Sequence, residues 1–81
     1  MKKKLPALRL DLGAAPLIEI VGNRRVTVEG STGILLYETG CIKLSAGDLV
    51  LSFEGRGLSL HCVSGSCVEV EGFITKVDFL S

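Results

Sequence analysis

Short apolar runs alternate with polar turns that carry glycine through most of the chain. The clearest pair of runs, residues 26–29 and 34–37, flanks a turn that contains Gly30 and Gly33. Extended runs joined at glycines, which tolerate the backbone angles of tight turns, are typical of β-hairpins. Similar runs recur about every eight or nine residues, which is the spacing of an all-β sandwich or barrel.

The pattern therefore predicts a small antiparallel all-β meander of about seven or eight short strands, forming a sandwich or open barrel. The predicted strands are 17–21, 26–29, 34–37, 41–45, 49–53, 58–63 and 67–71, followed by an extended stretch to Leu80. Residues 55–57, Gly-Arg-Gly, are predicted to form a hairpin turn, and Gly72 a bulge or bend inside an extended segment. Even glycine spacing also fits a short β-solenoid, which ranks second because this length allows only about two or three rungs.

Most runs have one apolar and one polar face, as strands of antiparallel sheets do. Val26 and Val28, for example, alternate with Thr27 and Glu29. Two runs, residues 34–36 and 49–51, are apolar on both faces, and we expect them to be central strands or part of a subunit interface. The candidate interaction residues are accordingly Ile34, Leu35, Leu36, Tyr37, Leu49, Val50, Leu51 and Phe53.

Composition and charge divide the chain into a basic start and an acidic remainder. Apolar residues make up 47% of the chain, which excludes disorder for most of it. Residues 1–25 carry six basic and two acidic side chains, and residues 26–81 carry three basic and seven acidic ones. We predict a basic, poorly ordered tail over residues 1–16 and an all-β domain over residues 17–81. The basic start lacks the apolar core of a signal peptide, so a cytoplasmic protein is expected.

The residues with chemical potential form no recognisable reaction centre. His61 is the single histidine and falls on a predicted solvent face, and Glu69 and Glu71 share a strand face as any alternating pair does. Three cysteines without a signal peptide argue against a secreted disulfide framework. We predict no catalytic residues, no cofactor and no metal site, so the protein is expected not to be an enzyme.

The cysteines are expected to act as small buried hydrophobes, Cys62 foremost and Cys41 next. Cys62 and Cys67 flank a four-residue loop, so a disulfide between them is geometrically possible. A zinc site is disfavoured because His61 and Cys62 are adjacent on a strand and point to opposite faces. A redox or metal module on Cys62 and Cys67 is the weakest alternative.

The spacing of the whole set of β signals resembles the YabP/YqfC family of sporulation proteins, and the YqfC branch in particular. The resemblance covers about residues 12–79. It departs from the family where Ser31 stands at a position that often holds histidine, and where Gly47 comes a couple of residues early. The residues that carry it are Ile20, Val21, Gly22, Asn23, Val26, Thr27, Val28, Glu29, Gly33, Ile34, Tyr37, Ile42, Lys43, Leu44, Gly55, Glu71, Gly72, Phe73 and Ile74.

The resemblance implies a non-enzymatic protein of the mother cell that takes part in assembly of the developing spore's envelope and coat. It implies contacts with a sporulation membrane protein and a location in the mother-cell cytoplasm, peripheral at the forespore surface. We also expect a homodimer or homo-oligomer, and neither nucleic acid nor a small-molecule substrate as partner. The alternative is a small β-barrel that binds a ligand or nucleic acid, which four aromatic residues and an acidic body disfavour.

Overall fold

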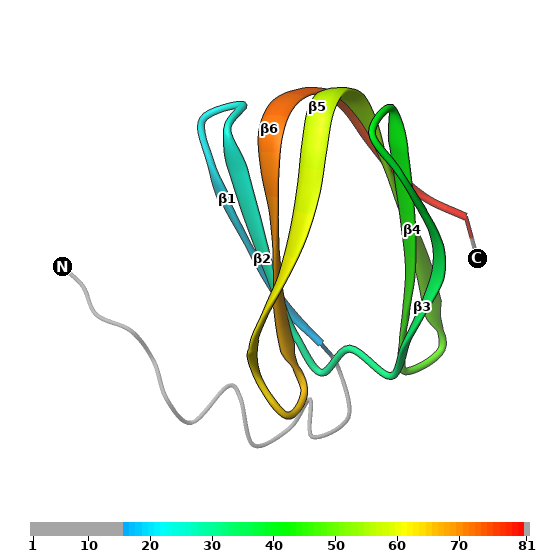
Figure 1. Cartoon of the computed structure of the whole chain (residues 1–81). Helices are drawn as coiled ribbons and strands as arrows, with labels where there is room; N and C mark the ends of the chain where they lie inside the picture. Colours follow the sequence, from blue (N-terminus) through cyan, green and yellow to red (C-terminus); the bar gives the residue numbers. More distant parts are fainter. Residues whose placement is uncertain (1–15, 81) are drawn as a thin grey trace, which may run out of the picture.

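The chain folds into six antiparallel β-strands that form one sheet (Figure 1). The computed structural model describes residues 16–80, so the predicted tail lies outside the described residues except for Pro16. The order across the sheet is β1-β2-β6-β5-β4-β3. The all-β class is confirmed, and the solenoid alternative is wrong because every pair of neighbouring strands is antiparallel. The strands are β1 (Leu17–Val21), β2 (Arg25–Glu29), β3 (Gly33–Glu38), β4 (Cys41–Ala46), β5 (Leu49–Ser64) and β6 (Cys67–Phe79).

Two hairpin systems build the sheet. Strands β3, β4, β5 and β6 form a meander, and the β1–β2 hairpin adds to the free side of β6. The link from β2 to β3 runs between the two systems. Its Gly30 N–H and Ser31 N–H donate to the carbonyl of Ser66 at 2.9 and 3.0 Å, and its Thr32 N–H donates to the carbonyl of Ser45 at 2.8 Å. These bonds tie the β5–β6 turn and β4 to the same short segment.

The strand count is lower than predicted because the turn expected at residues 55–57 is a bend within a long strand, and the extended stretch after Gly72 belongs to the same strand as residues 67–71. β5 spans 16 residues and β6 spans 13. The hairpin turn expected at residues 55–57 is wrong, since β5 continues through it with shifts of register against β6. The bend expected at Gly72 is confirmed, because β6 continues past it with a φ of 139°. One long bent hairpin therefore replaces four short strands.

The glycines at the bend allow the two long strands to approach each other closely. A Cβ atom at residue 55 would overlap the carbonyl oxygen of Phe73. A Cβ at residue 72 would lie 2.7 Å from the carbonyl oxygen of Gly57, and the φ there is one that L-residues rarely adopt. Glycine at these two positions is thus required by contact between backbones.

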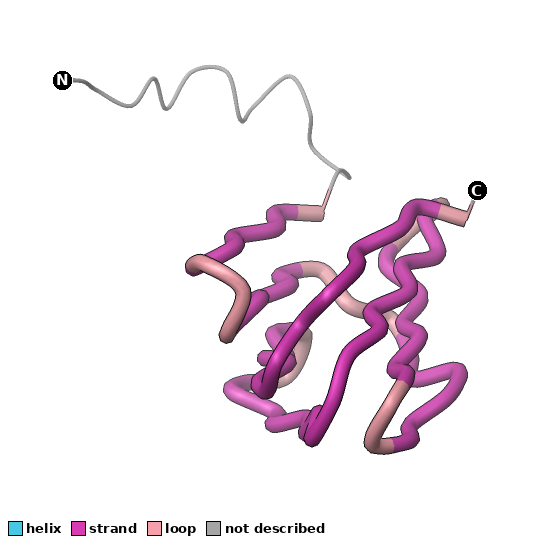
Figure 2. The backbone as a smooth tube through the Cα atoms, turned by 90° about the horizontal axis from the view of Figure 1, so that it is seen from above, coloured by secondary structure: helices cyan, strands magenta, loops and turns pink. Residues whose placement is uncertain are grey.

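The bend folds the sheet so that its two halves enclose one apolar core, and the strands seen from above lie around a common interior (Figure 2). The first half of β5 pairs with β4, and its second half pairs with the part of β6 that joins β2. The predicted alternation of apolar and polar faces is confirmed in β2 and β4. Their apolar residues Val26, Val28, Ile42 and Leu44 are all fully buried. The other buried hydrophobic residues of the cluster are Ala46, Leu51, Phe53, Leu58, Val68, Val70 and Ile74.

No helix long and apolar enough to span a membrane occurs within residues 16–80.

Candidate interaction surfaces

The first predicted interaction segment lies at an edge of the sheet. β3 is the last strand in the order and pairs with β4 alone. The register shifts between Ile34 and Leu36, so Leu35 is the extra residue of a β-bulge. Leu35 is 56% exposed and Ile34 48%, while Leu36 is half-buried. The expectation of a central strand is wrong for these residues, and what they form is an apolar edge with unpaired backbone groups.

The second predicted segment lies inside the sheet. Leu51 and Phe53 are fully buried in the core, and Leu49 and Val50 are half-buried. The whole of β4 separates this part of β5 from β3. The two runs that are apolar on both faces therefore do not combine into one surface, and only the β3 run presents its side chains to solvent.

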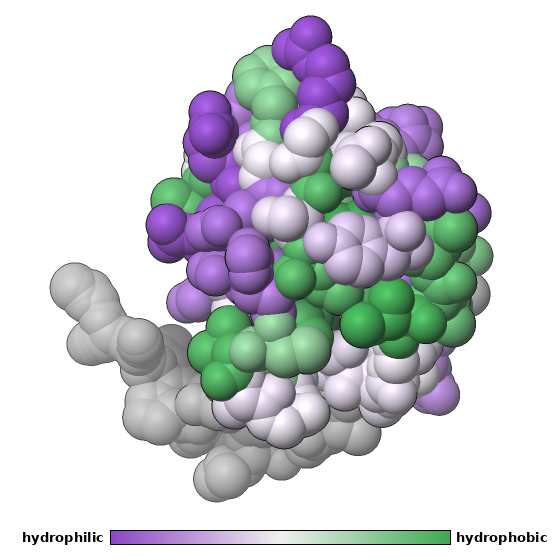
Figure 3. Space-filling model, in the orientation of Figure 1, coloured by the Kyte–Doolittle hydropathy of each residue, from purple (hydrophilic) through white to green (hydrophobic). Residues whose placement is uncertain are grey.

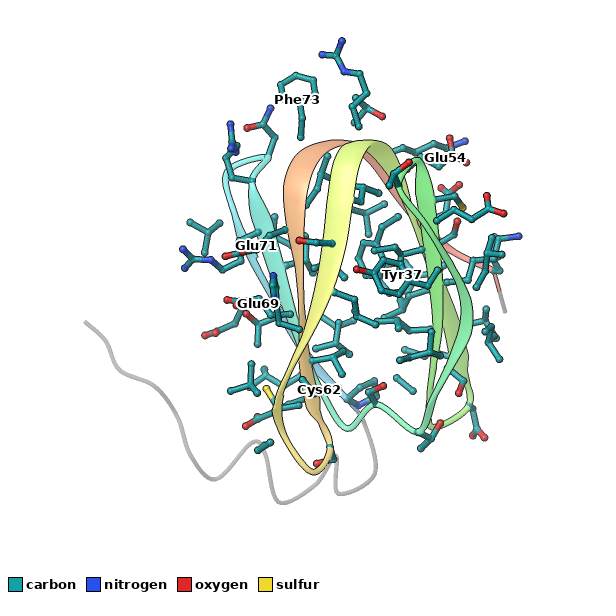
Figure 4. The ribbon with its side chains drawn as sticks, viewed as in Figure 1. Tyr37, Glu54, Cys62, Glu69, Glu71 and Phe73 are labelled. Atoms are coloured by element: carbon teal, nitrogen blue, oxygen red, sulfur yellow. The ribbon has the colours of Figure 1, made fainter. Side chains whose placement is uncertain are left out.

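β3 also approaches the second half of β5 across an open seam. The Leu58 N–H donates to the carbonyl of Thr39 at 2.9 Å, just beyond the end of β3. Two residues further along β5, the Leu60 N–H donates to the hydroxyl of Tyr37 at 3.0 Å. Tyr37 lies between the ribbons of β3 and β5 in Figure 4, and it is 51% exposed. The tyrosine thus spans the seam where no strand pairing closes the sheet.

The opposite edge is a second apolar strand, and the sequence reasoning did not single it out. β1 is first in the strand order and pairs with β2 alone. Leu17, Ile20 and Val21 are each about half exposed, Ile20 the most at 57%. The signal was present in the sequence, because residues 17–21 carry apolar side chains on both faces around the single Glu19. Exposed strands of this kind offer backbone and apolar contacts to another strand.

A row of polar side chains crosses the outer face of β2, β6 and β5. The Arg25 Nε lies 3.2 Å from a carboxylate oxygen of Glu69 and 3.5 Å from one of Glu71. The other oxygen of Glu71 lies 3.3 Å from His61 Nε2, and Ser59 Oγ lies 3.2 Å from the same nitrogen. The predicted shared face of Glu69 and Glu71 and the solvent face of His61 are confirmed.

The chemistry of this row is that of surface ion pairing. A nucleophile–base–carboxylate relay needs the nucleophile and the carboxylate on different nitrogens of the imidazole. Here Ser59 and Glu71 both contact Nε2 of His61. Arg25 meanwhile holds both carboxylates, and the side chains of Arg25, Glu71 and His61 are 41 to 53% exposed. Cross-strand pairs of this kind add modestly to the stability of a sheet.

A second exposed ion pair lies on β6. Lys76 Nζ is 3.2 Å from a carboxylate oxygen of Asp78. The pKa of Lys76 is raised, chiefly by its hydrogen bond to Asp78, then by the charge of Asp78 and that of Glu54 on β5. Glu54 faces Lys76 across the β5–β6 ladder, so its charge is partly balanced by this lysine.

The cysteines take places that differ from those expected. Cys62 is exposed, Cys41 is half-buried and Cys67 is buried, so the expectation of burial is wrong for Cys62. Cys62 faces Val68 in the β5–β6 ladder, while Cys67 faces Ser64, and all three thiols are free. Cys62 lies close to the β5–β6 turn, where Val63 and Ser64 are exposed as well.

Residues 16–80 contain no group of three or more His, Cys, Asp or Glu side chains able to hold a metal ion. The hydrophobic and hydrophilic side chains visible on one face are mixed, with apolar residues gathered along the seam between β5 and β3 (Figure 3).

Compared with known proteins, the chain has no significant match to a family model, to a curated protein or to a solved structure.

Proposed function

We propose that this is a non-enzymatic sporulation protein that acts in the mother cell as an assembly or interaction factor for the developing spore envelope and coat. It works by β-sheet contacts with a second copy of itself or with a sporulation membrane protein. In this role it needs no cofactor, small-molecule substrate or nucleic acid.

The observation that carries the proposal is the pair of apolar edge strands. β1 and β3 end the sheet on its two sides, and each presents exposed Leu and Ile side chains beside unpaired backbone groups. Soluble proteins usually protect such edges with charges, prolines or covering segments. β3 has no charged residue between Gly33 and Tyr37, and β1 has only Glu19. Edges of this kind favour addition of a strand from a partner.

The sporulation setting rests on the resemblance to the YabP/YqfC family. The residues that carry the resemblance lie in the strands and turns of a single sheet, which is compatible with a common architecture. Ser31 stands in the β2–β3 link at the position that often holds histidine in that family. Its backbone N–H donates to the carbonyl oxygen of Ser66 in the β5–β6 turn. Every residue except proline can donate this N–H, so the bond is open to serine and histidine alike.

The test follows a fluorescent fusion of the full chain through growth and sporulation of an endospore-forming host. We expect a ring or cap around the forespore that appears only after engulfment begins. A free fluorescent protein expressed from the same promoter is the control and should fill the mother cell evenly. Diffuse fusion signal in vegetative cells would show that the resemblance is one of architecture alone.

A further inference from the structure

The bend of the long hairpin and the β1–β2 turn meet at one end of the molecule. The Gly72 N–H donates to the carbonyl of Arg24 at 3.1 Å, and the Ile74 N–H donates to the carbonyl of Asn23 at 2.8 Å. Phe73 lies between these two anchored residues, at the top of the view in Figure 4. The Arg56 guanidinium carbon lies 4.6 Å from the centre of the Phe73 ring. We call Arg24, Arg56 and Phe73 the basic apex.

The two arginines of the basic apex have charges that the rest of the described chain does not balance. Neither Arg24 nor Arg56 has a carboxylate within ion-pair distance among residues 16–80. Nearby Glu71 is engaged by Arg25 and His61. Glu54, the acidic residue closest in sequence to Arg56, lies well to the side of Phe73 in Figure 4 and faces Lys76 across the ladder. The apex is therefore locally positive.

Apart from the apex, the described part of the chain is mainly acidic, which gives residues 16–80 an electrostatic direction. Residues 16–80 carry five basic and eight acidic side chains. An anionic surface would repel most of this body and attract the end that carries Arg24 and Arg56. The charges of residues 16–80 thus favour an orientation with the bend of β5 and β6 towards such a surface.

Phe73 adds an apolar contact at the same end. It is 37% exposed although its neighbour Ile74 is buried in the core. Arg56 covers one face of the Phe73 ring, so the pair exposes an apolar edge beside a cation. A guanidinium binds phosphate oxygens through paired N–H donors, and an aromatic ring beside it suits the boundary between lipid headgroups and acyl chains.

We propose that the basic apex docks on an anionic phospholipid bilayer, with Arg24 and Arg56 on lipid phosphates and Phe73 at the headgroup boundary. Nucleic acid fits less well, because single strands need aromatic platforms along a basic groove, and here Arg56 occupies a face of one isolated ring. The charges and contacts of the apex favour this docking whether or not the protein acts in sporulation.

The experiment measures co-sedimentation of the full chain with phosphatidylcholine vesicles, with and without phosphatidylglycerol. The wild type should bind the anionic vesicles and not the neutral ones. The double variant Arg24→Gln/Arg56→Gln should bind about 25-fold more weakly, at about fivefold for each cation near the membrane. The matched control, Lys43→Gln/Lys76→Gln, loses the same charge away from the apex and should bind within about twofold of the wild type.

Two further variants distinguish a loss of binding caused by the changed charge or contact from a loss caused by misfolding. Arg56→Lys keeps the cation but loses the paired N–H donors, so it should bind more tightly than the double glutamine variant and less tightly than the wild type. Circular dichroism melts of all variants report folding. The chain has no tryptophan, so Phe73→Trp provides a single reporter whose emission should shift to the blue on anionic vesicles alone. Equal loss of binding in the lysine control, or loss on changing only Lys2, Lys3 and Lys4 to Gln, overturns the proposal. Binding to a single-stranded oligonucleotide without binding to vesicles also overturns it, in favour of nucleic acid.

Discussion

The hydroxyl of Tyr37 accepts a hydrogen bond of 3.0 Å from the backbone N–H of Leu60. Leu60 pairs with Val70 of β6 on its other side, so this N–H points away from β6 towards the edge strand β3. A tyrosine hydroxyl thus takes the place that a backbone carbonyl would hold in a closed sheet. One side-chain atom joins the two halves where their strands separate.

Tyr37→Phe should therefore weaken the seam without disturbing the core. The variant keeps the ring and removes the acceptor of the Leu60 N–H, and we expect a loss of about 1 kcal/mol in the free energy of unfolding. Urea denaturation measures this loss. Amide exchange should speed up at Leu60 while Val70, which lies in the β5–β6 ladder, keeps its protection. Unchanged exchange at Leu60 would contradict a role for the hydroxyl.

Gly55→Ala should prevent the close crossing of β5 and β6. An added Cβ would overlap the backbone carbonyl of Phe73, so one of two long strands must move. We expect a loss of more than about 3 kcal/mol, or failure to fold. Gly65→Ala is the matched control, because a Cβ at residue 65 meets no atom within 4 Å and the backbone there has no positive φ. Thermal melts that fall equally for both variants would contradict the account of the bend.

The same glycine shows why the strand count could not be obtained from the sequence. Residues 55–57 carry the local signal of a turn, since glycine suits both a chain reversal and a close backbone approach. Which of the two occurs depends on the partner strand, which is distant in sequence. Where the signal is alternation of side chains, as at Val26 and Val28, the prediction is confirmed because burial on one face follows directly from the pleat.

The interaction candidates show a second limit. Apolar side chains on both faces of a run mark either a strand covered on both sides or an exposed edge, and the sequence reasoning treated residues 34–36 and 49–51 alike. The structure places Leu51 in the core and Leu35 at the edge. Strand order decides between these outcomes, and it arises from long-range pairing that no local pattern encodes. The edge at β1 carries apolar side chains on both faces as well, and the same criterion applied to residues 17–21 would have found it.

The three thiols should differ in reactivity in the order of their exposure. Cys62 is exposed, Cys41 half-buried and Cys67 buried, and none is in a disulfide. Iodoacetamide in native buffer, followed by peptide mass spectrometry, should label Cys62 first and Cys67 only on unfolding. Cys62→Ser should remove the fast phase and leave the rest unchanged. Rapid labelling of Cys67 in the native protein would place this thiol at the surface and contradict the packing of β6.

Leu35→Lys tests whether β3 is the surface through which copies associate. Leu35 is the exposed extra residue of the β3 bulge, so lysine fits there without burying its charge, and the free energy of unfolding should change by less than about 0.5 kcal/mol. If copies pair along this edge, the charge should shift light-scattering mass from oligomer to monomer. Val50→Lys should do the same only at the expense of stability, because Val50 is half-buried.

Two controls assign the effect to an edge. Val21→Lys places the same charge on β1 at the other end of the sheet, where the side chain is also about half exposed. Ser64→Lys places it near the β5–β6 turn and reports the effect of charge alone. If the oligomer is lost with Leu35→Lys and kept with Val21→Lys and Ser64→Lys, the copies associate through β3. If it is lost with Val21→Lys alone, they associate through β1. Equal masses for all variants and the wild type would contradict pairing at either edge, since a buried lysine charge opposes strand addition at any register.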